Sequence, residues 1–129
     1  MISFLLSVPQ YVRFVLLVIY VGCIVALSLL PPQDLPQVEL FYGADKLIHL
    51  MMYFIFAMLG CWALKAEENR ARIFLIILVT VGWGIFMEFM QLEMHAGRSF
   101  SWYDELANAT GVLTGILFYL LTSNNTVKG

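Results

Sequence analysis

Residues 11–30 read YVRFVLLVIYVGCIVALSLL and contain a single charged side chain, Arg13. About 20 apolar residues, each rising about 1.5 Å along a helix, cross a hydrocarbon layer about 30 Å thick. Pro31 and Pro32 follow directly, and proline cannot continue a helix because it lacks the amide donor. The segment therefore predicts a membrane-spanning helix that ends at residue 30.

The composition of the whole chain agrees with a membrane location. Of 129 residues, 61% are hydrophobic and 12% are charged, whereas a soluble domain carries roughly 25% charged residues. Lipid offers the backbone no hydrogen-bond partners, so a spanning chain forms helices or a closed barrel. Long apolar runs without alternation favour helices, and the mean hydropathy is +0.85.

Three further apolar runs of similar length follow, at residues 45–64, 72–92 and 103–121. Ser101 is the predicted N-cap of the last run. We therefore predict an all-α fold, a four-helix transmembrane bundle with short loops that forms one domain over residues 1–129. The first apolar run extends back to Ile2, which is long for a signal peptide and favours a retained helix.

The basic residues predict the orientation, because Lys and Arg are kept on the cytoplasmic side. Five of the seven would lie on one side of the membrane, and Lys46 and Arg98 on the other. We expect both termini in the cytoplasm (N-in, C-in). The five are Arg13, Lys65, Arg70, Arg72 and Lys128.

With this topology, eight polar residues from separate segments lie at the outer level of the membrane. Asp45 and His49 are four residues apart and so share a helix face, as do Asp104 and Asn108. Ionisable residues at this depth usually face a cavity or one another, so the eight predict an outward-facing polar pocket. They are Asp45, Lys46, His49, Glu88, Gln91, Arg98, Asp104 and Asn108.

Several polar residues at this level also have a simpler structural interpretation, among them Asp45, Lys46 and Asp104 at the helix starts. Carboxylates at helix starts are often solvated and stabilised by the helix dipole, and for Glu105 we expect this solvated role. His49 could be a core histidine, and Glu88 with Gln91 could be interhelical hydrogen-bonding groups.

Small residues recur every four positions in the last run, at Ala107, Gly111 and Gly115. This spacing lets helices approach closely, so we expect the last helix to pack centrally. Gly82 and Gly84 are expected to do the same for the third helix. Cys23 and Cys61 fall at different depths, so neither a disulfide nor a metal pair is predicted.

Four segments together resemble the successive motifs of VanZ-like membrane proteins, over about residues 20–120. They are SLLP at 28–31, DKLIHLMMYF at 45–54, MEFMQ at 87–91 and RSFSWYDELANATG at 98–111. The family name comes from an association with low-level resistance to the glycopeptide antibiotic teicoplanin. The resemblance implies a cell-envelope role at the outer side of the bacterial cytoplasmic membrane, and names no reaction.

One hypothesis is an enzyme acting on a membrane lipid or a lipid-linked envelope precursor. Lys46 and Arg98 would bind a phosphate, with Gln91 and Asn108 as further ligand-binding residues. Asp45 would orient His49 for proton exchange near neutral pH, and Glu88 or Asp104 would act as a second acid or base.

Two other hypotheses remain open: an accessory protein that binds a headgroup without changing it, and a structural network that specifies helix packing. The carboxylates and His49 could bind a divalent ion, but no metal-binding motif is present, so we assign no metal ligand and leave the cofactor unknown. A net charge of −2 without an aromatic-basic motif excludes nucleic acid as a partner. Homo-oligomerisation is left open.

Overall fold

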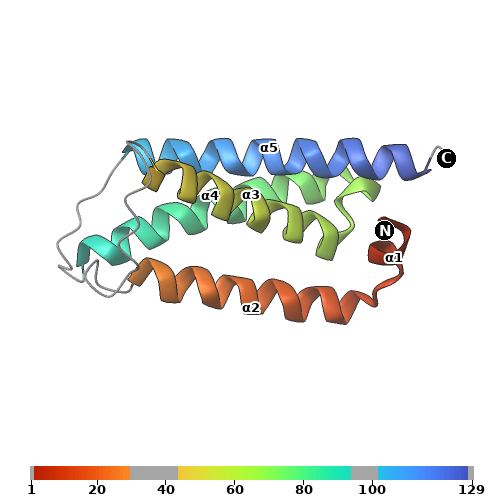
Figure 1. Ribbon diagram of the computed structural model, residues 1–129, viewed down its shortest axis with the longest axis horizontal. Coiled ribbons are helices and arrows are strands. Elements are labelled where there is room, and N and C mark those ends of the chain that lie inside the picture. The colour runs from red at the N-terminus through yellow and green to blue at the C-terminus, as the bar shows by residue number, and fades with distance from the viewer. Residues whose placement is uncertain (1, 30–43, 94–101, 128–129) are drawn as a thin grey trace.

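The computed structural model describes residues 2–29, 44–93 and 102–127, and every regular element in this part of the chain is a helix. Four are long and apolar enough to cross a membrane (Figure 1), which confirms the four predicted spans and the all-α fold. These four are α2 (Gln10–Leu29), α3 (Ala44–Leu64), α4 (Arg70–Glu93) and α5 (Trp102–Val127).

Two short elements were not predicted. Helix α1 (Ile2–Ser7) belongs to the apolar extension before the first span, and Pro9 separates it from α2. The 3-10 helix η2 (Ala66–Glu68) begins after Lys65, whose φ of 51° is left-handed and ends α3. Both lie at the end of the bundle where α3 ends and α4 begins.

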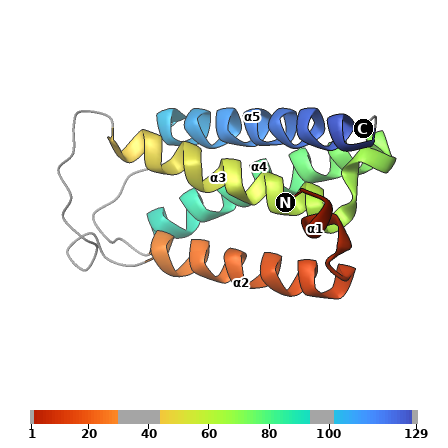
Figure 2. The ribbon, with the colours of Figure 1, turned by 45° about the vertical axis from the view of Figure 1, so that its right-hand side comes forward.

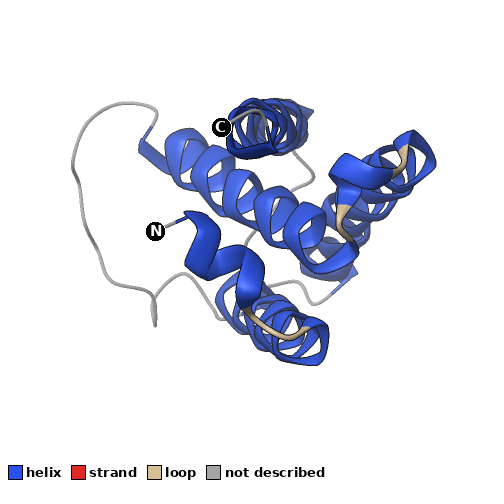
Figure 3. Ribbon diagram, turned by 90° about the vertical axis from the view of Figure 1, so that its right-hand side faces the viewer, coloured by secondary structure: helices blue, strands red, loops and turns tan. Residues whose placement is uncertain are grey.

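The four long helices run side by side (Figures 1 and 2). Helices α3 and α5 begin at the same end of the bundle at which α2 and α4 finish, and we call this the polar end. Helix α3 packs against α2, α4 and α5, as the view along the bundle shows (Figure 3). The central position therefore belongs to α3, and not to α5 as predicted.

The closest helix contact is between α3 and α5. A methyl group added at Gly115 would lie 2.5 Å from the carbonyl oxygen of Phe54, and one at Gly111 would overlap the carbonyl oxygen of Leu50. The two backbones therefore touch, which confirms the close approach predicted for Gly111 and Gly115. Apart from the backbone of α4 itself, no atom of the described residues lies within 4 Å of a methyl group added at Gly82, so the packing role predicted for it is wrong.

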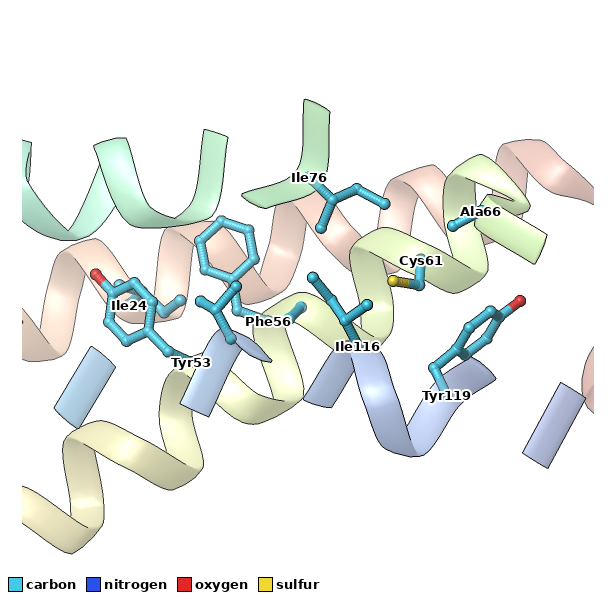
Figure 4. Close-up of a cluster of buried hydrophobic side chains, with 10 residues drawn as sticks. Ile24, Tyr53, Phe56, Cys61, Ala66, Ile76, Ile116 and Tyr119 are labelled. Carbon is cyan, nitrogen blue, oxygen red and sulfur yellow. The ribbon is translucent and has the colours of Figure 1, made fainter. Parts of the chain in front are cut away.

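Helix α3 also supplies much of the apolar core (Figure 4). Tyr53, Phe56 and Cys61 are buried there beside Ile76 of α4 and Ile116 of α5. Both cysteines are free, as expected. Large apolar side chains cover the outer faces of the helices, which matches a surface that contacts lipid.

Arginines stabilise the end opposite the polar end. The buried Arg13 guanidinium donates hydrogen bonds to the carbonyl oxygens of Leu6, Val8 and Trp62, at 2.6 to 3.0 Å. Arg72 donates to the carbonyl oxygen of Leu64 at 2.9 Å. Cations at the C-terminus of a helix are favourable, so both contribute to the stability of the bundle.

We predict that Gly111→Ala destabilises the protein by about 1–3 kcal/mol, because the added methyl group forces α3 and α5 apart. Gly82→Ala is the matched control, since it adds the same group in open space and should be neutral or slightly stabilising. Denaturant unfolding in detergent micelles measures both. Equal stability of the two variants would contradict the close contact.

Candidate functional site

The structure describes the side chains of five of the eight predicted site residues. These five are Lys46 and His49 on α3, Glu88 on α4, and Asp104 and Asn108 on α5. Asp45 lies in the first turn of α3 and Gln91 in the last turn of α4, but their side chains are outside the described part, and Arg98 is outside it altogether. All five described residues lie toward the polar end.

Lys46 and Asp104 form an ion pair between the first turns of α3 and α5. The Lys46 side chain is 40% exposed and that of Asp104 is 18% exposed. Exposed pairs contribute only about 0–1 kcal/mol, so this pair does little to hold the helices together. Its main effect is to place an ammonium group, with a balancing carboxylate, beside the first turns of α3 and α5 at the polar end.

One turn deeper, His49 and Asn108 join the same two helices. The distance from His49 Nδ1 to Asn108 Oδ1 is 3.1 Å, and Asn108 is buried with 1% of its surface exposed. An amide oxygen only accepts hydrogen bonds, so Nδ1 is the donor. In the neutral imidazole, Nε2 is then the acceptor and can take a proton from another group.

Glu105 is the residue that sequence reasoning misplaced. It was expected to be solvated, but it is 6% exposed, and neither carboxyl oxygen has a hydrogen-bond partner in the described part of the chain. The physical reason is its place on α5, at the start of a buried stripe with helical spacing. The stripe comprises Glu105, Asn108, Val112, Ile116, Tyr119 and Ser123.

The Glu105 carboxyl packs against a glycine of α4. A methyl group added at Gly84 would lie 3.3 Å from each carboxyl oxygen of Glu105 and 3.2 Å from Nδ2 of Asn108. Because Gly84 has no side chain, Glu105 and Asn108 can pack directly against α4 at this position. This agrees with the close packing predicted for Gly84. Asn108 is near enough to interact with the carboxyl, although the two groups lack hydrogen-bonding geometry.

A second buried carboxyl, that of Glu88, lies close by. Glu88 is 3% exposed and follows Gly84 by one helical turn. It interacts electrostatically with Glu105, and both carboxyls interact with the hydroxyl of the buried Tyr53. Three helices thus bring Tyr53, Glu88 and Glu105 into one neighbourhood.

We call the seven residues of these contacts the polar cluster: Lys46, His49, Tyr53, Glu88, Asp104, Glu105 and Asn108. Its imidazole and its buried carboxyls can exchange protons, and its ammonium group can bind an anion. Within the described ranges, no group of three His, Cys, Asp or Glu side chains is placed to hold a metal ion.

A family model described as VanZ/LLP1 matches residues 11–123, which include almost all of the four long helices. The chain belongs to the VanZ/LLP1 family. This confirms the resemblance drawn from the four motifs. No curated protein and no solved structure matches the chain. Membership of the VanZ/LLP1 family and the four apolar helices together identify a multi-pass membrane protein.

We predict a coupling free energy of about 0.6 kcal/mol between His49 and Asn108, a value typical of interhelical hydrogen bonds in membranes. A double-mutant cycle with His49→Ala and Asn108→Ala, read by unfolding in detergent, measures it. The control cycle pairs His49→Ala with Thr110→Ala, because the exposed Thr110 bonds only its own helix in the described part. Equal coupling in the two cycles would contradict the cross-helix bond.

Proposed function

We propose that this VanZ/LLP1 protein acts at the extracytoplasmic face of the bacterial cytoplasmic membrane, where its polar cluster binds or modifies the headgroup of a lipid or a lipid-linked envelope precursor. The supporting observation is that two buried carboxyls, those of Glu88 and Glu105, lie at the same end of the bundle as the half-buried Lys46, His49 and Asp104. Such groups are costly inside a membrane and usually serve a ligand or one another. Glu105, buried without a hydrogen-bond partner in the described chain, is the clearest instance.

The distribution of basic residues supports the proposed orientation. Arg13, Lys65, Arg70 and Arg72 lie toward the end opposite the polar cluster. Because Lys and Arg are kept on the cytoplasmic side, the polar end would face outward. A ligand would then come from the outer leaflet or the envelope, where a glycopeptide antibiotic also acts, so a role in the teicoplanin response would be an indirect result of a changed envelope.

The outer edge of the cluster suits an anionic headgroup. Lys46 is partly exposed and is held by Asp104, so its ammonium group can approach a phosphate while the carboxylate fixes its position. His49 lies one turn deeper and offers a proton acceptor at Nε2. An enzyme would use this imidazole for proton transfer, whereas an accessory protein would only hold the headgroup.

A second candidate is a non-enzymatic accessory protein whose cluster is a structural network. The cross-helix pairs Lys46 with Asp104 and His49 with Asn108 favour it, because they join α3 to α5 directly. This reading predicts that loss of the bond between His49 and Asn108 lowers stability and leaves bound lipid unchanged.

We expect a phospholipid or a lipid-linked precursor to co-purify with the protein and to be lost in Lys46→Ala. Loss of the ammonium group should lower the bound amount about tenfold, the equivalent of about 1.4 kcal/mol. Lipid extraction and mass spectrometry of protein purified in a mild detergent measure it. Arg70→Ala is the matched control, an exposed cation at the other end of the bundle.

A comparison of the lipids extracted from cells with and without the protein distinguishes modification of a headgroup from binding without modification. A changed lipid species supports chemistry, and bound but unchanged lipid supports headgroup binding. Equal lipid in the wild type, Lys46→Ala and Arg70→Ala would contradict a headgroup site at the polar end and favour the structural network.

A further inference from the structure

We propose that Glu105 is the proton-holding acid of the polar cluster, an uncharged carboxylic acid that can donate its proton in a hydrogen bond to an oxygen atom of the ligand. The inference deepens the proposed function and rests on it for the ligand. The state of the carboxyl itself can be measured without any ligand.

Burial is the first argument. Only 6% of Glu105 is exposed, and both of its oxygens lack a hydrogen-bond donor in the described part of the protein. An ionised carboxylate removed from water without compensation is very costly, and a buried carboxyl avoids the cost by keeping its proton.

The neighbours of Glu105 on each packed helix give the second argument. Helix α4 contributes Gly84 and the carboxyl of Glu88, α3 contributes the hydroxyl of Tyr53, and α5 contributes the uncharged Asn108. None of these groups is a cation. A second carboxyl nearby also opposes ionisation, because two like charges cannot both be accommodated in a medium of low dielectric constant.

The ammonium group of Lys46 and the imidazole of His49 interact with residues other than Glu105. Lys46 pairs with Asp104, and His49 bonds Asn108 through Nδ1. Asp104, which the sequence suggested as an acid, is therefore engaged by the ammonium group of Lys46. Glu105 has no such partner in the described chain, and so it is the better proton holder of the two.

A neutral acid at this position determines which ligands fit. A carboxylate would repel a phosphate, whereas a carboxylic acid donates a hydrogen bond to a phosphate or carbonyl oxygen. Some enzymes keep a buried carboxyl neutral at pH 7 for this purpose. Gly84 supports the arrangement, since any side chain there would occupy space next to both oxygens.

Infrared spectroscopy of the purified full-length protein at pH 7 tests the proposal. A protonated carboxyl has a carbonyl stretching band that a carboxylate lacks. We expect this band in the wild type, its loss in Glu105→Gln, and its retention in Glu68→Gln, which changes an exposed glutamate. The amide bands of the same spectra report whether each variant keeps its helices.

Should Glu105→Gln fail to fold, Glu105→Asp keeps an acid at the position. Carbon-13 labelling of the aspartates should then shift the band in Glu105→Asp and leave it unshifted in the wild type. Absence of the band from the wild type would overturn the proposal. So would its survival in Glu105→Gln together with its loss in Glu88→Gln, since the proton would then lie on Glu88.

These outcomes are independent of the headgroup proposal. If the band depends on Glu105 but no lipid co-purifies, the proposal of a neutral Glu105 is supported and the proposal of a headgroup site is contradicted. If lipid is bound through Lys46 but the wild type has no acid band, the headgroup site stands and the role of Glu105 fails.

Discussion

Direct backbone contact between α3 and α5 is the constraint on which the rest of the structure depends. Gly111 and Gly115 bring α5 against the carbonyl oxygens of Leu50 and Phe54, and contact this close leaves little freedom to slide or rotate. The same register sets Asn108 opposite His49 about one turn of α5 before Gly111, and Asp104 opposite Lys46 about two turns before it. Two glycines, which have no reactive side chains, therefore determine the position of the polar cluster.

Buried polar groups at the two ends of the bundle differ in whether they have hydrogen-bond partners. At the end where α3 finishes, Arg13 donates to three carbonyl oxygens and Tyr119 donates to Glu67 at 2.7 Å, so these groups are satisfied within the protein. At the polar end the Glu105 carboxyl lacks such a partner in the described chain. Stability alone explains the first arrangement, whereas the second has a cost that a binding function would justify.

The sequence predicted the parts of the fold that depend on local properties. The lengths of the four apolar runs predicted the spans, and Pro31 predicted where the first span ends. The spacing of Gly111 and Gly115 predicted a close helix contact. The sequence did not show that α3 would be central, because the partner of a glycine face depends on three-dimensional packing. It also misplaced Glu105: helix starts favour solvated carboxylates, yet the stripe that leads through Asn108 and Val112 already had the spacing of a buried face.

Crosslinking between the first turns of α3 and α5 tests the central claim most directly. In a background without Cys23 and Cys61, cysteines replacing Lys46 and Asp104 should be joined rapidly by a short thiol-reactive crosslinker in native membranes. Cysteines replacing Lys46 and Leu106 should not, because Leu106 is exposed on another face of α5. Equal crosslinking of the two pairs would show that the helices do not meet in this register, and would contradict the account.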